Sequence, residues 1–295
     1  MLRENLIEKT EEALDTRGFG HCRCIGCFDI AARKRSMFLI KVLVNIDAFQ
    51  HEQSMGLGTL SQNIDASPVI IGSHTRYEKL NNDIIYERFD IPSMTLNTFV
   101  RMIDNDLPYM YRFRGGLYAK ISAKKLRLSR KAKGLSQREL AQSAGVSKKS
   151  IYEHESSDKP MSYNTTIKIR KILHQEILEP IAISDFHLSE DKSLPSNMFE
   201  KDVSRRLTTM GFDIDFIRKA PFNMLASEKM TLILDAEENT AEKNISYIRD
   251  FAELVKRPAM LVTKSNQEFD MPAIQKKELD EISSPRELLR MLKRW

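Results

Sequence analysis

A carboxylate and a lysine lie on two neighbouring apolar stretches near the N-terminus. The segment CFDIAARKRSMFLIKV, residues 27–42, contains Asp29 in its first stretch and Lys41 near the end of its second. Both stretches have the length and composition of β-strands. Carboxylate oxygens are preferred ligands of Mg²⁺, so this pair could belong to a metal site that hydrolyses a substrate. Position 39, two residues before the lysine, is a leucine.

A second group of residues could bind a softer metal. The segment HCRCIGC supplies His21, Cys22, Cys24 and Cys27 within seven residues, 21–27. Zinc uses such ligands, but no second cluster in the sequence completes a four-ligand site. In an extended stretch, Cys22 and Cys24 would point to one face as small buried thiols. We therefore expect buried thiols and neither a metal nor another cofactor, with metal binding or redox sensing as the alternative.

The length and composition describe an ordinary globular protein. The chain has 295 residues, of which 41% are hydrophobic and 29% charged, enough for two or three domains. No apolar run approaches the roughly 18 residues that a membrane span needs. The first 19 residues form an acid-containing amphipathic pattern rather than a signal peptide. We therefore expect a cytoplasmic protein without a membrane partner.

Positive charge is concentrated in the middle of the chain. Residues 121–160 contain ten lysines and arginines against four acids, a local balance of +6, whereas the whole chain carries +5. A basic block in an otherwise neutral protein is typical of a contact with the phosphates of a nucleic acid. A solvated helix face is the alternative that charge alone leaves open.

The pattern inside this basic block predicts short helices. Gly134 ends a first helix, and Ser136 with Glu139 three residues later forms a capping box for a second. Gly145 ends the second helix, and Ser147 caps a third. Two short helices joined by a glycine-containing turn predict a helix-turn-helix, in which the helix at 147–155 would enter the major groove of DNA.

The segment LSQRELAQSAGVSKKSIYEHE resembles the helix-turn-helix of the phage Cro repressor class over about residues 126–173. The resemblance implies that Gln137 contacts a phosphate and helps to orient base-reading side chains. It also implies that the first residues of the recognition helix reach base edges or flanking phosphates. The glycine that members usually carry after this helix is replaced here by residues 156–158. Our candidate DNA-binding residues are Arg130, Gln137, Arg138, Ser147, Lys148, Lys149, Ser150 and Tyr152.

The two flanks of the basic block share a pattern. Phe28 aligns with Phe222, and MFLIKV at 37–42 aligns with TLILDA at 231–236. Further on, the apolar segment at 67–73 corresponds to the one at 257–263, and each flank closes with a helix that carries an Arg-Met pair. This predicts an internal repeat of one α/β unit in the order helix, strand, strand, helix, strand, helix. Chance similarity between two α/β segments is the alternative.

The same order of elements resembles the restriction-endonuclease-like fold. In such nucleases two carboxylates hold Mg²⁺ and a lysine steadies the attacking water. The matching positions are Asp29, Leu39 and Lys41 in the first copy, so one carboxylate is missing. The second copy has Asn223, Ile233 and Asp235 there. We therefore expect no catalytic residue and no metal in either copy, although a relocated acid such as Glu52 would allow a nuclease.

The whole chain resembles archaeal helix-turn-helix transcriptional regulators, and the resemblance is strongest over residues 112–155. It implies DNA binding and transcription regulation by the central segment. The expected fold is α/β plus all-α, with two degenerate restriction-endonuclease-like domains around a Cro-type helical domain. The expected limits are 1–115 for the first α/β domain, 116–180 for the helix-turn-helix domain, 181–196 for a linker and 197–295 for the second α/β domain.

The sequence thus predicts a non-enzymatic regulator that binds double-stranded DNA at specific sequences. A single short helix discriminates weakly between sites, so we expect a homodimer that pairs through the α/β domains. An effector of unknown identity or the transcription machinery would be a further partner. The alternative is a metal-dependent DNA nuclease that the helix-turn-helix directs to its target.

Overall fold

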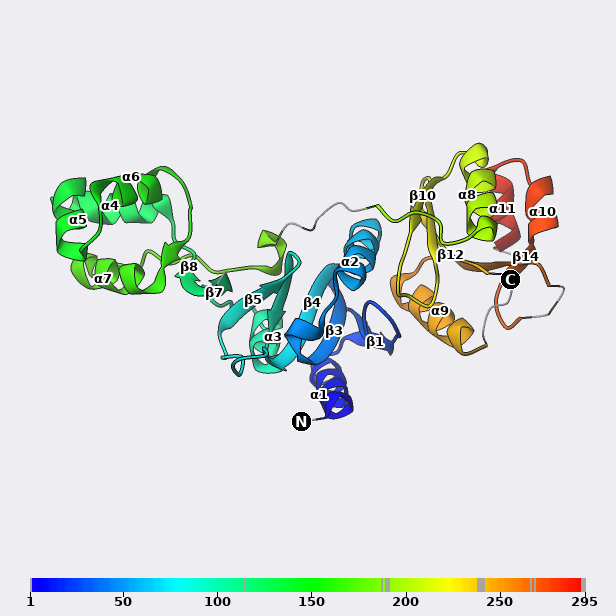
Figure 1. The fold of residues 1–295 in the computed structure, drawn as a ribbon, viewed down its shortest axis with the longest axis horizontal. Helices are drawn as coiled ribbons and strands as arrows, with labels where there is room; N and C mark the ends of the chain where they lie inside the picture. The colour runs from blue at the N-terminus through cyan, green and yellow to red at the C-terminus, as the bar shows by residue number, and fades with distance from the viewer. Residues whose placement is uncertain are drawn as a thin grey trace. The chain divides into compact units, whose positions relative to one another are not determined.

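The structure is a computed structural model that describes residues 2–113, 115–186, 188, 192–237, 242–265, 267 and 269–292. Figure 1 shows the helices and strands along the chain, with labels for most of them. The chain divides into two compact units. The first contains the described residues of 1–71, 89–91 and 187–295, and the second those of 72–88 and 92–186. Part of the predicted linker, at 187 and 189–191, lies outside the described residues. No helix in the described ranges is both long and apolar enough to span a membrane.

The first unit begins with a helix and four strands that lie side by side in the order β1-β2-β3-β4. Strand β2 runs antiparallel to both of its neighbours, and β3 is buried over its first six residues. Helix α1 packs against β3. The elements are α1 (Arg3–Asp15), β1 (Gly20–Arg23), β2 (Ile30–Arg33), β3 (Met37–Asn45), the 3₁₀-helix η1 (Ile46–Ala48), α2 (His51–Ile64) and β4 (Ser67–His74).

The C-terminal part of this unit repeats the order of the N-terminal part: a helix, three strands, a helix and a strand. Its five strands lie in the order β10-β11-β12-β13-β14, with β11 antiparallel to both neighbours and β12 parallel to β13. The elements are α8 (Met198–Met210), β10 (Asp213–Phe216), β11 (Met224–Ser227), β12 (Thr231–Ala236), α9 (Glu242–Val255), β13 (Ala259–Thr263), β14 (Ala273–Gln275), α10 (Lys276–Glu281) and α11 (Pro285–Leu292).

The register of the two parts also matches. The backbone N–H of Asp29 donates to the carbonyl of Ile40, and that of Asn223 donates to the carbonyl of Leu234. Lys41 therefore has the same place in its sheet as Asp235. Because side chains alternate between the two faces of a strand, this register aims each pair of equivalent side chains at the same side.

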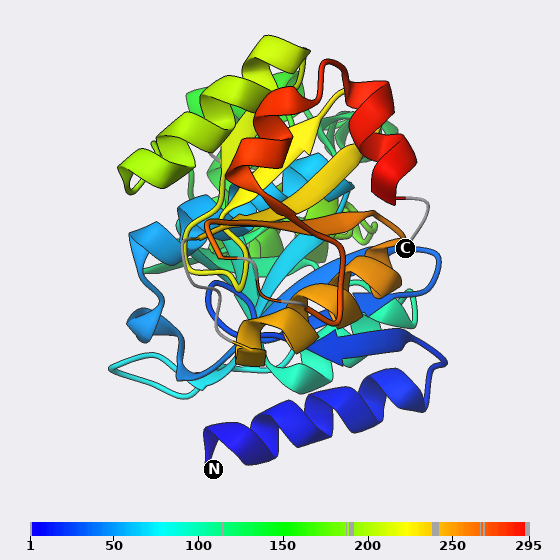
Figure 2. The ribbon, with the colours of Figure 1, turned by 90° about the vertical axis from the view of Figure 1, so that its right-hand side faces the viewer.

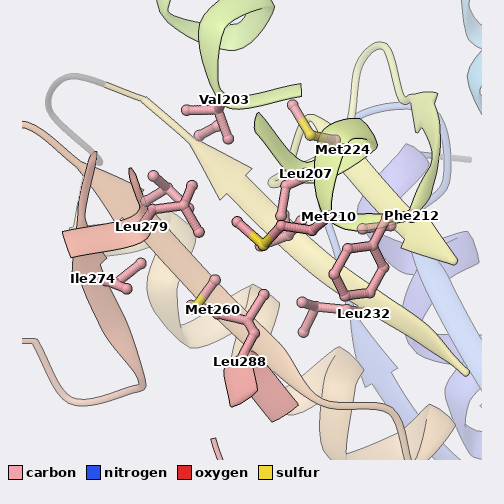
Figure 3. Packing of buried hydrophobic residues seen from close by; sticks show 14 of the residues in the cluster. Val203, Leu207, Met210, Phe212, Met224, Leu232, Met260, Ile274, Leu279 and Leu288 are labelled. Carbon is pink, nitrogen blue, oxygen red and sulfur yellow. The ribbon is translucent and has the colours of Figure 1, made fainter. Parts of the chain in front are cut away.

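One face of the C-terminal sheet carries a continuous apolar core. Side chains from α8, such as Val203 and Leu207, meet side chains from the strands, such as Leu232 and Met260 (Figure 3). Leu279 of α10 and Leu288 of α11 close the same core and are fully buried. These helices thereby cover one face of the sheet.

Residues far apart in the sequence hold the two parts of the first unit together. Helix α9 packs against β1 and β2 (Figure 2), and Arg33 Nη1 donates to the carbonyl of Leu254 on this helix at 3.1 Å. Helix α2 contacts the C-terminal part in an equivalent way. Its Asn63 amide donates to the Asp215 carboxylate at 3.1 Å and accepts the Ser227 hydroxyl at 3.3 Å. Asn63 and Leu254 are both the next-to-last residues of 14-residue helices. The contacts are thus reciprocal, as around an approximate twofold axis.

Three phenylalanine rings lie at this contact. Phe251 of α9 packs against Phe28 with ring centroids 5.4 Å apart, and against Phe222 with centroids 5.5 Å apart. All three side chains are at most 1% exposed. Phe28 and Phe222 come directly before equivalent positions of the two repeated parts, so one residue of α9 contacts the same point of both.

The second unit combines strands with a group of helices. Its strands lie in the order β6-β5-β7-β8-β9, and β5 runs parallel to β7. Residues 72–88 and 92–113, which precede the helices, cluster with them in this unit. The elements are β5 (Ile84–Arg88), β6 (Ile91–Met94), α3 (Leu96–Ile103), β7 (Met110–Phe113), β8 (Gly116–Ala119), α4 (Ala123–Ala132), α5 (Gln137–Ala144), α6 (Lys148–Ser156), β9 (Met161–Ser162), α7 (Tyr163–Leu173) and the 3₁₀-helix η2 (Ile183–Asp185).

We predict that Phe251→Ala destabilises the first unit strongly, because it removes a ring that both Phe28 and Phe222 contact. The free energy of unfolding should fall by about 3 to 5 kcal/mol in urea denaturation. Met198→Ala is the control, since this side chain in the same unit is 65% exposed. It should change the value by no more than about 0.5 kcal/mol. Equal effects of the two changes would contradict this packing.

Candidate nucleic-acid interface

Helices α5 and α6 are each capped where the sequence predicts a cap. The Ser136 hydroxyl accepts the N–H of Glu139 at 3.2 Å, and the Glu139 carboxylate accepts the N–H of Ser136 at 2.7 Å. Gly145 ends α5 with a φ of 69°, a conformation that suits glycine. The Ser147 hydroxyl then accepts the N–H of Ser150 at 3.1 Å and begins α6. The chain thus forms two short helices joined by a tight turn.

The two helices sit on a common apolar core with α4 and α7. Leu126, Leu140 and Ile151 are completely buried, one each from α4, α5 and α6. Ile169 of α7 and Met161 of β9 also belong to this core, and β9 pairs with β8. Burial of one side of each helix leaves the opposite sides of α5 and α6 to solvent.

A buried ion pair joins α4 to α6. The Arg130 guanidinium donates to both carboxylate oxygens of Glu155, at 2.5 and 2.9 Å, and also to the carbonyl of Leu135 at 2.7 Å. Gln137 Nε2 donates to the same carboxylate at 2.8 Å. The side chains of Arg130 and Glu155 are only 10% and 2% exposed. This network fixes the spacing of α4, α5 and α6.

The pKa of Glu155 reflects these contacts. Burial acts to raise the pKa, but the hydrogen bonds from Arg130 and Gln137 outweigh it, so the pKa lies below its ordinary value of 4.5. The carboxylate therefore stays charged at neutral pH and keeps its cation. Sequence reasoning missed Glu155, because a charged residue in a basic block gives no sign of whether it is buried.

The remaining candidate DNA-binding residues lie toward solvent. Arg138, Ser147, Lys148 and Lys149 are exposed, and Lys149 Nζ lies 3.9 Å from the carboxylate of Glu153 one turn away. Tyr152 is 59% exposed, and Ser150 and Gln137 are half-buried. The structure therefore gathers two lysines at the positive, N-terminal end of α6, which together favour an anionic ligand.

Asp29 and Lys41 do meet, but as a buried ion pair. Asp29 Oδ1 lies 3.1 Å from Lys41 Nζ and 2.5 Å from Arg3 Nη2, and Oδ2 accepts the N–H of Val42 at 2.8 Å. Lys41 Nζ also donates to the carbonyl of Gly26 at 2.6 Å. Both Asp29 and Lys41 are 5% exposed. Arg3, which the sequence did not indicate, thus neutralises the carboxylate together with Lys41.

The equivalent position of the second repeated part is uncharged. Asn223 Oδ1 accepts the N–H of Ala236 at 2.9 Å, just as Asp29 accepts that of Val42, and Nδ2 donates to the Ala236 carbonyl at 3.0 Å. Ile233 is fully buried and apolar. Glu52, the proposed relocated acid, instead lies 3.5 Å from Lys219. Asn223 and Glu52 thus each have a protein partner.

The three cysteines are free thiols. Burial raises the pKa of Cys22 and of Cys27 to about 12, with nearby Asp250 adding to the effect at Cys22. Burial also raises the pKa of Cys24 well above its usual range. His21 lies 2.9 Å from Asp15 through Nε2. In the part of the chain that the structure describes, no three metal-ligating side chains gather at one point.

We predict that Arg130→Met lowers the free energy of unfolding by about 3 to 5 kcal/mol, because Glu155 would remain buried without its cation. The double variant Arg130→Met, Glu155→Leu should recover most of this stability. The charged pair stabilises the fold above pH 4.5, the ordinary pKa of Glu155, and this contribution disappears as the pH falls through the lowered pKa. Chemical denaturation of the wild type and of the double variant between pH 7 and pH 2 measures this contribution.

The stability difference between the wild type and the double variant should therefore change on acidification. A difference that is the same at every pH would show that Glu155 is not held charged by Arg130.

Comparison with known proteins places the sequence in a family. Residues 3–108 match the model of the PD-(D/E)XK superfamily domain. A protein of Thermococcus kodakarensis named "Putative HTH-type transcriptional regulatory protein" is 30% identical over 99% of this chain and 96% of its own length. Proteins of the same name from Pyrococcus horikoshii and Methanocaldococcus jannaschii are 30% and 29% identical over 99% of this chain. The chain therefore belongs to the archaeal family that carries this name, and its N-terminal part matches the PD-(D/E)XK superfamily domain.

Proposed function

We propose that this protein is a sequence-specific DNA-binding regulator of transcription that reads double-stranded DNA with α6. The observation that carries the proposal is the capped pair α5–α6, whose second helix begins with the exposed Lys148 and Lys149. This pair lies in the block with a local charge of +6. The names of the relatives support the same function.

In the proposed complex, the N-terminal end of α6 enters the major groove in the manner of the Cro class. Lys148 and Lys149 would contact guanine O6 and N7 or the flanking phosphates, for which a flexible ammonium group is suited. The Ser147 hydroxyl accepts the N–H of Ser150 as a helix cap, so its own O–H can still donate to DNA. Tyr152 and Arg138 would contact the backbone at the edges of this surface.

Gln137 and Arg130 have different roles in this proposal. Glu155 holds the Gln137 amide, so its orientation is set before DNA arrives. Arg130 is buried and both oxygens of its partner are used, so we assign it to positioning α6 rather than to touching DNA. This narrows the set of candidate residues that the sequence suggests.

The PD-(D/E)XK domain is proposed to act without catalysis. A nuclease of this kind needs two carboxylates on a metal, but Leu39 stands at the second position and Asp29 already has two cations and one N–H as partners. A divalent ion would have to displace Arg3 and Lys41 from a buried carboxylate. The domain and its C-terminal counterpart, which we propose to be a second degenerate copy, would then serve as a scaffold.

The proposed regulator acts as a homodimer in the cytoplasm. The α/β parts already pack against each other within one chain through α2 and α9, so dimerisation would use other faces. An effector or the transcription machinery would be a further partner.

We predict that selection of genomic fragments by the purified protein in the presence of Mg²⁺ yields one palindromic motif with intact ends. The variant Lys148→Ala, Lys149→Ala should bind this motif more weakly, with a salt dependence flatter by roughly one unit of slope for each phosphate that is no longer neutralised. Lys277→Ala with Lys201→Ala is the control, because both are exposed lysines outside the basic block. Its affinity and salt slope should match those of the wild type. Unchanged binding by the Lys148, Lys149 variant would place the interface elsewhere.

We also predict that Asp29→Ala acts on stability and not on DNA cleavage. Supercoiled plasmid with Mg²⁺ or Mn²⁺ should stay intact with the wild type and with the variant alike. The free energy of unfolding of the variant should fall by about 3 to 5 kcal/mol, because Lys41 would be left buried without a carboxylate. Metal-dependent cleavage by the wild type, absent from the variant, would instead establish the nuclease.

A further inference from the structure

A recess lined by cations lies in the first unit, where the turn between β2 and β3 meets the C-terminal ends of α2 and α9. Its volume of about 600 Å³ is within the range of small-molecule sites. Arg33, Arg35, Lys256 and Arg257 line it, against the single carboxylate of Asp65. The lining therefore carries a formal charge of +3 at neutral pH.

Three of these cations have no partner among the described residues. The side chains of Arg35, Lys256 and Arg257 form no ion pair or hydrogen bond within the described ranges. Other arginines of this protein, such as Arg3 and Arg130, are tied to carboxylates. Like charges that converge in a recess repel each other, and a bound anion would remove this cost.

A cation near the C-terminal end of a helix can serve to bind the last carbonyl groups of that helix. Among the described residues, this role explains one of the four cations. Arg33 donates to the carbonyl of Leu254 at the end of α9. The backbone itself caps both helices: the N–H of Arg257 bonds Ala252 at 3.0 Å, and that of Ala66 bonds Ser61 at 2.8 Å. The side chains of Arg35 and Arg257 are therefore not required to cap a helix and remain free to bind a ligand.

The rest of the recess suits a phosphate group. Ser36 and Ser67 supply hydroxyls, and the buried side chains of Met37, Ile64 and Val255 form its apolar floor. Arginine offers a planar fork of donors that matches two phosphate oxygens at once. Two unpaired arginines and a lysine around one cavity are thus a favourable set of donors for several phosphate oxygens.

We propose that this recess binds a small phosphorylated anion with at least two phosphate groups, of the class of inorganic pyrophosphate or a nucleoside diphosphate or triphosphate. A duplex backbone presents its phosphates along a line, whereas these cations converge on one small volume. The site does not depend on whether α6 reads DNA, and it involves no residue of the basic block.

Both repeated parts contribute to this site, Arg33 and Arg35 from the N-terminal part and Lys256 and Arg257 from the C-terminal part. A bound anion would therefore bridge the two parts and stabilise their contact. Because a ligand that binds only the folded state raises the unfolding temperature, thermal unfolding should report binding.

The experiment is isothermal titration of the full chain with pyrophosphate and with ATP, accompanied by thermal unfolding at the same ligand concentrations. The recess variant is Arg35→Glu with Arg257→Glu. The control is Lys277→Glu with Arg286→Glu, which makes the same change in net charge at exposed positions of the same unit outside the recess. We expect saturable binding at one site that is at least about ten-fold weaker in the recess variant and unchanged in the control.

The recess variant should unfold at the same or a higher temperature than the wild type without ligand, because it relieves repulsion among like charges. If it fails to fold, Arg35→Gln with Arg257→Gln takes its place with the same expectation. Absence of saturable pyrophosphate binding, or equal weakening in the control, would overturn the proposal. Displacement of pyrophosphate by random-sequence duplex DNA, with DNA affinity also abolished in the recess variant, would overturn it in favour of a backbone contact.

Discussion

The packing of Phe251 between Phe28 and Phe222 is the contact on which the first unit depends. Each repeated part builds a sheet with one face covered by its own helix, and the other face needs an apolar partner. Helix α9 supplies it for β1 and β2, while α2 contacts the C-terminal strands through Asn63. The repeated parts therefore complete each other, and the protein has an internal contact of the kind that a dimer of identical domains would form.

Charged groups of the first unit come together at two places. In the interior of the N-terminal part, the Asp29 carboxylate contacts Arg3, Lys41 and the N–H of Val42. At the recess between the β2–β3 turn and the ends of α2 and α9, cations converge around a single carboxylate. Buried charges in folded proteins are normally paired, and the interior set meets this rule by itself. The recess differs, because its cations lie at or near the surface and are proposed to bind an added anion.

The helical segment is organised by the same rule. Arg130 and Glu155 would each be costly to bury alone, but together with Gln137 they join α4, α5 and α6. The exposed lysines at the start of α6 are not part of this network, and they carry the proposed DNA contact. The same chain carries, over residues 3–108, a match to the PD-(D/E)XK superfamily domain.

The sequence by itself determined the local features of this protein, whereas only the tertiary structure decided which charged groups are buried and what they meet. The caps at Ser136 and Ser147 and the end of α5 at Gly145 follow from residues within a few positions of each other, because local hydrogen bonds leave a direct mark on sequence. Arg130 instead meets Glu155 across 25 positions, and Arg33 meets Leu254 across 221. No spacing rule marks such pairs, because contacts between distant segments depend on how whole helices and sheets cover each other, and a charged residue has the same letter whether it faces water or the core.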